Sequence, residues 1–434
     1  MFQTGTNKGV SMQTQKPTGQ ILSYAFGIMI AAVVVSCLIL TFYLTSDAFA
    51  AQMLKTKSVA ELTEIIQPLS EGKRPHQGAL QDRMLGAILQ LGEGEDSLDQ
   101  RISSIAMAGN ISDTEYESAA EIAIKKLGDV THQPLSEMLA SDDPEEILHA
   151  VICIKLLGEE ASKFVPELIE MIESGDPMTT RYGVFALQNM GASATPAVEA
   201  LNEVVESLDF NAQIMVCKAV VGIGRDAVPI ADTLAKLYEK GNPSARSWAG
   251  IALGAIGPIE NFDTAQMLGS RVTAFNHVEK VRALEGLSLM GDEGASQQEI
   301  IKAAMVDPEG RVRPEAAYAY YRVTAETETP VKVLVEMLGR RDYSLESLKF
   351  LRLMGPDARA AIPDVRALLS NESVALRESA VLVLGNMGAV AADEIASIKN
   401  LASDPDPLLR QAVEEAVAAI EKDVAKQKSG DNDE

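Results

Sequence analysis

The residue types that most often carry chemistry are few in this chain, and their spacing matches no catalytic or metal site. Only four histidines and three cysteines occur in 434 residues. Cys37 lies in an apolar run, Cys153 and Cys217 lie in segments with helical patterning, and no C-x-x-C pair is present. The motifs G-x-x-x-x-G-K-[ST], G-x-S-x-G and H-E-x-x-H are also missing. The sequence therefore predicts a non-catalytic protein with no cofactor, no metal and no evident small-molecule substrate.

One acidic cluster, Asp142-Asp143-Pro144-Glu145-Glu146, has side chains that could hold calcium. It lacks the alternating D-x-D-x-D-G pattern of a calcium loop. An Asp before Pro, followed by two acids, is instead typical of a helix start, where the helix dipole favours negative charge. We therefore predict a helix N-terminus at this cluster.

The charge of the chain is strongly acidic and unevenly distributed. The formal net charge is -24, from 38 basic and 62 acidic residues, which argues against nucleic acid as a partner. Residues 91–210 contain 24 acidic and 6 basic side chains, whereas residues 311–366 contain 8 acidic and 10 basic. The second region is therefore a candidate place for a partner site.

Region 311–366 also concentrates tyrosine and arginine, which are favoured at interface hot spots. The candidate partner-binding residues are Arg311, Arg313, Tyr318, Tyr320, Tyr321, Arg340 and Arg341. The alternative is an irregular segment with solvated charges and partly buried tyrosines. Trp248, the single tryptophan, is expected to pack between structural units.

An uncharged segment near the N-terminus has the length of a membrane span. Residues 21–44 read ILSYAFGIMIAAVVVSCLILTFYL, and no charge occurs between Lys16 and Asp47. As a helix, such a segment rises about 36 Å, enough to cross a hydrocarbon core of ~30 Å. We predict a short tail over 1–20 and a transmembrane helix over 21–45 that acts as a signal anchor. A buried soluble helix is the simpler alternative.

A cleaved signal peptide is a second alternative, because Ala48-Phe49-Ala50 fits an A-x-A cleavage site and would give soluble export. The lysines flanking the apolar segment do not decide its orientation, since two precede it and two follow it closely. The lack of acids in residues 1–20 favours an N-terminus inside. The remainder of the chain would then be extracytoplasmic, in a periplasmic location.

The rest of the chain is built from a repeated element, a helix that ends in a large apolar residue followed by glycine. The matching pairs are Leu157-Gly158, Met190-Gly191, Ile223-Gly224, Ile256-Gly257, Met290-Gly291, Met354-Gly355 and Met387-Gly388. Successive glycines are separated by 33, 33, 33, 34, 64 and 33 residues. The interval of 64 equals two units, with Val323-Thr324 in the slot of the missing glycine. Leu91-Gly92 and Leu127-Gly128 extend the series upstream.

The residue pattern of each repeat unit predicts two helices. The first often opens with proline, as at Pro166 and Pro363, and a turn with Asp or Asn before Pro then caps the second helix. These turns are Asp143-Pro144, Asp176-Pro177, Asn242-Pro243, Asp307-Pro308 and Asp404-Pro405. The closing glycine is expected to form a left-handed cap. Because one helix pair cannot bury its own apolar face, the pairs must stack into an all-α solenoid.

We place this array at residues 95–422, a juxtamembrane helical region with a diverged first repeat at 46–94, and a disordered tail at 423–434. The turn Asp or Asn is followed about six residues later by a basic residue, as in Asp143 with His149 and Asp307 with Arg313. On these features the chain resembles the HEAT-repeat superfamily, and most of all the short bacterial type called the phycobilisome-lyase HEAT-like repeat. The resemblance implies that the turn residues connect adjacent units. The residues of this structural ladder are Asp143, Asp176, Arg181, Asn242, Arg246, Asp307, Asn371, Arg377, Asp404 and Arg410.

The resemblance leaves several functions open. Di-iron hydroxylases of this fold would need repeated His-Glu dipeptides, but the four histidines precede Gln77, Gln133, Ala150 and Val278. We therefore predict a bacterial, single-pass, membrane-tethered HEAT-repeat scaffold that mediates protein–protein interactions. One alternative is a lyase-like enzyme that handles a chromophore or metal, and another is a passive structural spacer in the cell envelope.

Overall fold

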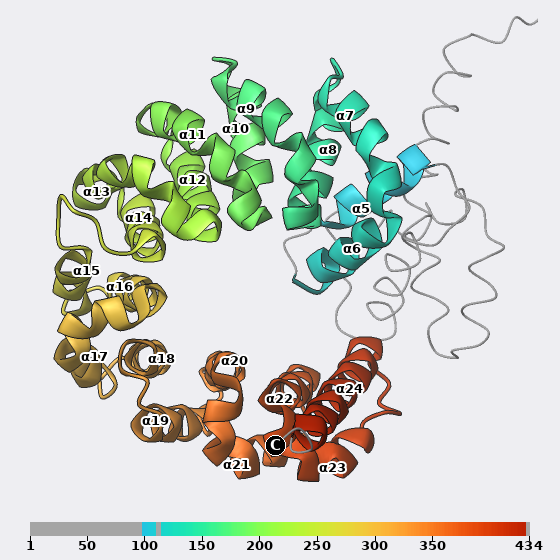
Figure 1. Ribbon diagram of the computed structural model, residues 1–434, viewed down its shortest axis with the longest axis vertical. Helices are drawn as coiled ribbons and strands as arrows, with labels where there is room; N and C mark the ends of the chain where they lie inside the picture. The colour runs from blue at the N-terminus through green and yellow to red at the C-terminus, as the bar shows by residue number, and fades with distance from the viewer. Residues whose placement is uncertain (1–97, 110–113, 431–434) are drawn as a thin grey trace, which may run out of the picture. The chain divides into compact units, whose positions relative to one another are not determined.

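The computed structural model of the protein describes residues 98–109 and 114–430 (Figure 1). Contacts divide the chain into two units, 1–104 and 105–434, and the account below concerns the second. The predicted tail 1–20, the transmembrane segment 21–45 and the juxtamembrane region 46–94 lie outside the described residues. Within those residues the regular elements are α- and 3-10 helices, apart from one isolated β-bridge between Ile259 and Phe262. The predicted all-α class is confirmed.

The helices alternate between two layers (Figure 1). The first unit ends in α5 (Leu98–Gly109), whose last residues open the second. The outer helices are α7 (His132–Leu139), α9 (Val165–Glu173), α11 (Val198–Val204), α13 (Ala231–Lys240), α15 (Thr264–Val272), α17 (Gln298–Ala304), α19 (Glu328–Leu338), α21 (Ile362–Leu368) and α23 (Ile395–Lys399). The inner helices are α6 (Thr114–Leu127), α8 (Pro144–Leu157), α10 (Pro177–Ala186), α12 (Phe210–Ile223), α14 (Pro243–Ile256), α16 (His277–Met290), α18 (Val312–Thr324), α20 (Ser344–Met354), α22 (Val374–Met387) and α24 (Pro407–Gly430). Successive inner helices pack on one another, and most of them also pack on the outer helix that precedes them, which is the arrangement of an α-solenoid.

Small residues set the spacing between inner helices. A Cβ atom added to Gly254 of α14 would collide with the backbone of Gly286 of α16, and a Cβ on Gly286 would lie 2.8 Å from the carbonyl oxygen of Gly250. The two helices therefore approach backbone to backbone at this crossing. Most of the remaining core is aliphatic, with Leu253 and Leu287 fully buried nearby.

The closing glycines have the positive φ that the repeat pattern predicts, at positions 128, 158, 191, 224, 257, 291, 355 and 388. Their conformation is not the left-handed helical cap that we expected. Gly158 has φ 60° and ψ -128°, and Gly388 has φ 62° and ψ -140°. Only glycine enters this region without a steric clash. The glycines differ from a left-handed helical cap because the chain does not simply end a helix at them. Most of them are also the first residue of a 3-10 helix, as in η2 (Gly158–Phe164) and η9 (Gly388–Glu394).

The slot without a glycine behaves differently. Ala325 follows Val323-Thr324 and has φ 58° and ψ 11°, the left-handed helical conformation. It is the single non-glycine residue with positive φ among the described residues. No 3-10 segment follows it, and the chain enters α19 at Glu328. A left-handed cap therefore does occur in this array, but at the irregular turn.

The predicted helix starts are correct at three of the five Asp-Pro or Asn-Pro turns. Asp143, Asp176 and Asn242 each accept a hydrogen bond from a backbone N–H of the first helical turn, with Pro near the first helical position. Asp307 and Asp404 do not cap a helix, because α18 begins at Val312 and α24 at Pro407. These two carboxylates instead close short turns by accepting from Glu309 N and Asp406 N.

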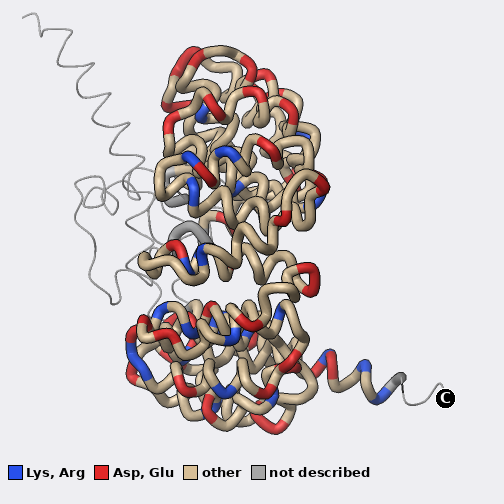
Figure 2. Tube along the Cα trace, turned by 90° about the vertical axis from the view of Figure 1, so that its left-hand side faces the viewer, with Lys and Arg blue, Asp and Glu red and all other residues tan. Residues whose placement is uncertain are grey.

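The predicted disordered tail is wrong over most of its length. Helix α24 continues to Gly430, so it includes residues 423–430 of the expected tail, and 431–434 lie outside the described residues. Lys, Ala and Gln in this stretch are good helix formers, and both acidic and basic positions occur toward the end of α24 (Figure 2). Among the described residues, 374–399 is the one helical stretch long and apolar enough to pass for a membrane span by composition. Half of its most apolar window is buried inside the array, as expected for core helices.

Candidate functional site

Ion pairs join successive outer-to-inner turns along one edge of the array. Arg181 of α10 donates to Asp209, which caps α12. Lys280 Nζ lies 2.6 Å from Asp307 Oδ2. At the C-terminal end, Arg377 Nη2 lies 2.8 Å from Asp404 Oδ2. Each pair links the start of one inner helix to the turn of the next unit. The charges of these side chains are therefore used in contacts between neighbouring units.

The spacing of six residues between turn and base has a separate structural use. Arg313 Nε donates to the carbonyl oxygen of Asp307 over 2.8 Å. Arg377 Nη1 donates to Asn371 O over 3.0 Å, and Arg410 Nη1 to Asp404 O over 2.8 Å. The arginine thus binds the backbone of its own turn. His149 cannot do the same as a cation, because burial lowers its pKa and favours the neutral ring, although nearby Glu145 opposes the shift.

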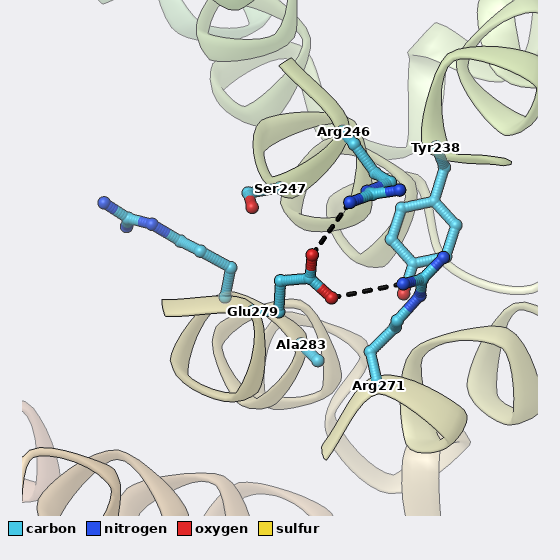
Figure 3. A pocket seen from close by; sticks show the side chains of 7 residues that line it. Tyr238, Arg246, Ser247, Arg271, Glu279 and Ala283 are labelled. Carbon is cyan, nitrogen blue, oxygen red and sulfur yellow. Dashed lines mark hydrogen bonds and ion pairs between the residues drawn. The ribbon is translucent and has the colours of Figure 1, made fainter. Parts of the chain in front are cut away.

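The turn at Asn276 departs from this ladder and forms a small polar cleft between α13, α14, α15 and α16 (Figure 3). Here the helix cap is uncharged, and Glu279 of the first turn supplies the anion. Its two oxygens accept from Arg246 over 2.8 Å and from Arg271 over 3.1 Å. Glu279 thus neutralises part of the positive charge of the two guanidinium groups, while the buried Arg246 Nε has no hydrogen-bond partner.

The cleft is also too small and too inert for catalysis. Its free volume is ≈ 10 Å³, about the room that one water needs. Tyr238 lies on its wall, with its hydroxyl donating to Met267 O over 3.3 Å. Burial raises the pKa of Tyr238 to about 12, so the phenol keeps its proton at neutral pH. We assign the cleft to packing between units.

Thiol or metal chemistry has little support in the part of the chain that the structure describes. No group of three or more His, Cys, Asp or Glu side chains there could hold a metal ion. Cys153 and Cys217 are fully buried. Burial raises the pKa of the Cys153 thiol far above its usual range and that of Cys217 to about 12, so neither is a nucleophile at neutral pH.

The structure divides the predicted partner-binding residues into two groups. Tyr318 and Tyr320 are only 8% and 9% exposed, and the Tyr318 ring stacks on Phe350 at 4.8 Å. The Tyr321 hydroxyl donates to Asp357 Oδ2 over 2.7 Å. Tyr318 and Tyr320 therefore pack α18 against its neighbours and Tyr321 is half-buried, in line with the alternative of partly buried tyrosines, and a role of these residues in partner binding stays a prediction.

The arginines of the predicted set lie at the turns instead. Arg311, Arg340 and Arg341 are exposed at the turns before α18 and α20. Arg313 is partly buried and lies 3.5 Å from Glu336 in α19. The tyrosines and arginines thus do not form one site, because the tyrosines turn into the helix stack from the middle of α18.

A different aromatic residue is presented by the inner layer. Trp248 of α14 is half-buried, and its ring lies between Lys218 of α12 and Arg282 of α16. The cations are 5.0 Å and 4.7 Å from the ring centroid. Lys155 of α8 lies 5.2 Å from the ring of Phe185 in α10, which repeats the arrangement two units earlier. We call Lys218, Trp248 and Arg282 the tryptophan row.

The tryptophan row was only partly foreseen from the sequence. Packing of Trp248 between units was expected, and the structure shows contacts with both neighbouring inner helices. The flanking cations were not identified. Their signal is periodic, since Lys218 and Arg282 each lie about one repeat from Trp248 in the sequence.

No protein-family model matches the chain, and comparison with curated protein sequences gives no match. Among solved structures, the chain is similar to importin beta, with 11% identity and a TM-score of 0.43, over 91% of this chain and 63% of that one. It is also similar to the karyopherin Kap121p bound to Pho4p, with 11% identity and a TM-score of 0.35, over 93% of this chain and 48% of that one. An engineered protein aligns over 78% of this chain and 98% of its own, with 18% identity and a TM-score of 0.38. Likenesses at this level add nothing to the description of stacked helix pairs.

Proposed function

We propose that this protein is a membrane-tethered, non-catalytic scaffold of the short bacterial HEAT-repeat type, and that its inner helices bind another protein. The observation that carries the proposal is the tryptophan row. The ring of this half-buried Trp contacts two cations, and part of its surface remains accessible to a partner instead of being buried in the core. Trp and Arg are the residue types most enriched at interface hot spots.

The tryptophan row is well suited to a rigid contact. Its three side chains come from α12, α14 and α16, which pack tightly on one another, so little side-chain freedom is left to lose on binding. Arg282 also lies 2.6 Å from Glu285, which fixes its direction. A partner that presents a carboxylate or an aromatic ring would match the two cations and the indole face.

The tether is proposed from the sequence. Residues 21–44 are uncharged and long enough to span a bilayer, with aromatic residues near both ends. The absence of acids in residues 1–20 supports an extracytoplasmic array. Protease treatment of cells whose outer membrane has been opened tests this orientation, because it should degrade the array only if the array lies outside the inner membrane. Carbonate extraction separates an anchor from a signal peptide cleaved after Ala50.

The partner is tested by cross-linking on native membranes with the wild-type chain and with Trp248→Ala. We expect the wild type to return a stable partner and the variant to lose at least ten-fold in recovery. Leu353→Ala is the matched control, since Leu353 is 50% exposed on an inner helix and lies outside the row. Recovery that is unchanged in Trp248→Ala, with normal thermal unfolding, would refute the tryptophan row as the site.

The two other candidate functions predict different results. A passive spacer needs no specific surface, so no stable partner would be recovered from the wild type. A lyase-like protein would carry a pigment or stoichiometric iron after purification from its native membrane. Absorbance spectra and metal analysis of that material separate this alternative from the scaffold.

A further inference from the structure

One edge of the array exposes a series of large apolar side chains. They all lie in turns that lead from an outer to an inner helix, or in the first residues of the inner helix. These residues are Met178, Phe210, Phe275, Val278, Val306 and Leu345. Val306 is 74% exposed, and Phe275 is completely exposed. We call this set the apolar edge. Apolar side chains repeated at one edge in successive turns mark an interaction surface.

The N-terminal end of the apolar edge is acidic. The turn between α7 and α8 carries Asp142, Asp143, Glu145 and Glu146, all exposed. Asp143 caps α8 through Glu145 N, and within the described residues no cation pairs with any of the four carboxylates. This acidic turn therefore keeps its full charge at the surface.

The C-terminal end of the same edge is basic. Arg311 lies in the turn before α18, and Arg340 and Arg341 lie in the turn before α20. The two turns are adjacent, because the ring of Tyr343 lies directly against Gly310. In the described part of the chain, Arg311 and Arg341 have no ionic partner, and Arg340 approaches Glu336 only to 3.9 Å.

Acids near these arginines do not cancel them. Asp307 is neutralised by Lys280 at 2.6 Å. Glu309 and Asp342 remain as two carboxylates beside three exposed arginines and Arg313. The basic end of the edge thus stands out in a chain whose formal net charge is -24.

The order of these features is palindromic along the seven turns from α7–α8 to α19–α20. The central turn joins α13 to α14 at Gly241-Asn242. Reversal of the order about this turn brings the acidic turn onto Arg340 and Arg341. It also brings Met178 onto the turn of Val306, and Phe210 onto the turn of Phe275. An edge that complements itself on reversal is what a two-fold contact between identical chains requires.

We propose that two copies of this chain associate through this edge, antiparallel, with the two-fold axis at the turn between α13 and α14. Each acidic turn then faces the arginines of the other copy, and the apolar side chains of both copies meet between them. A parallel arrangement is disfavoured because it places acid on acid. The contact does not depend on the tryptophan row, which lies on the inner layer, so it goes beyond the scaffold function proposed above.

The mass of the full chain in detergent, measured by light scattering across protein and salt concentrations, tests the dimer. Wild type should be dimeric, and its dissociation constant should rise with ionic strength, because exposed charge pairs are screened. Arg340→Glu with Arg341→Glu should be monomeric, and so should Glu145→Arg with Glu146→Arg. An equimolar mixture of these two double variants should restore the dimer, since both contacts are complementary again in the mixed pair.

Matched controls make the result specific. Arg352→Glu with Arg359→Glu reverses two exposed arginines away from this edge and should leave the dimer intact. Phe275→Ser should weaken association at least ten-fold without changing thermal unfolding, whereas Trp248→Ala should not affect it. A wild type that is monomeric at all concentrations would overturn the proposal, and so would a dimer that both charge reversals leave unchanged. If Trp248→Ala left partner recovery unchanged, the tryptophan row would be refuted as the partner site, but the proposed dimer would be unaffected.

Discussion

The ammonium group of Lys280 in α16 lies 2.6 Å from the carboxylate of Asp307 in the next turn, and the two side chains are only 17% and 10% exposed. Burial alone would raise the pKa of Asp307, but the hydrogen bonds from Lys280 and Glu309 N hold it below its usual range. This pair joins two consecutive units in a largely desolvated place. It is therefore a better test of the ladder than any exposed pair.

Replacement of Lys280 by Met should lower the free energy of unfolding by about 2–3 kcal/mol, because Asp307 is left largely buried without its cation. The lowered pKa means that the pair stabilises the fold above pH ~4 and that this contribution is lost as the pH falls further. Urea unfolding at neutral pH measures the effect. Lys236→Met is the control, since Lys236 and Glu206 are 64% and 65% exposed, and we expect a change below about 0.5 kcal/mol. Equal losses of stability in both variants would contradict the view that the buried pair contributes more than the exposed pair.

The closing glycine at position 355 should not tolerate a side chain. Its φ of 57° and ψ of -131° are strained for any L-residue, although a Cβ would meet its nearest neighbour, Asn386 O, at an acceptable 3.4 Å. Gly355→Ala should therefore cost about 1–3 kcal/mol through the backbone alone. Gly339→Ala is the control, because Gly339 has φ -71° and an added Cβ would meet only Glu336 O, at an ordinary contact distance of 3.5 Å, so the change should be neutral or slightly stabilising. The denaturant midpoints of the two variants test this prediction, and equal midpoints would contradict it.

Ala325 should respond in the opposite direction. Its left-handed conformation costs an alanine roughly 1–2 kcal/mol, and glycine pays no such steric cost. We expect Ala325→Gly to raise the free energy of unfolding by about 0.5–1 kcal/mol, after the larger entropy of glycine in the unfolded chain is allowed for. A destabilised Ala325→Gly variant in thermal unfolding would show that Ala325 does not hold this conformation in solution.

The carboxyl group of Glu315 should make stability depend on pH. It is 5% exposed on α18, between Arg282 and Glu285 of α16 and Glu346 and Lys349 of α20. Burial raises its pKa to about 8, with smaller contributions from the flanking charges. Between about pH 4.3 and 8 the unfolded chain has released this proton and the folded chain has kept it, so stability falls as the pH rises through this range.

Glu315→Gln should remove that decline. The variant should gain several degrees of melting temperature over the wild type at pH 8.5, and less at pH 5. Glu239→Gln is the control, because Glu239 is exposed on α13 and is not among the charges that flank Glu315, so this variant should follow the wild-type pH profile. Parallel pH profiles for wild type and Glu315→Gln would show that the Glu315 carboxyl is ionised in the folded protein.

Much of the candidate site could not be read from the sequence. The arginines at positions 311, 340 and 341 were identified as a partner surface, and the structure does place them in exposed turns. Tyr318 and Tyr320 were assigned to the same surface and are buried. Residues of one helix point in different directions, so nearness in sequence does not establish that side chains share a face. Only the helix stack determines which direction is solvent.

The sequence by itself determined the helix pairs, their period and the positions of the closing glycines. These features are local, because a positive φ admits glycine and a first helical turn admits proline wherever they occur. The tertiary structure decided how far Trp248 and Tyr318 are exposed, which carboxylate each arginine binds, and that one edge is apolar between an acidic and a basic end. Those properties depend on side chains from units about 33 residues apart in the chain, which only the stacking of the units brings together.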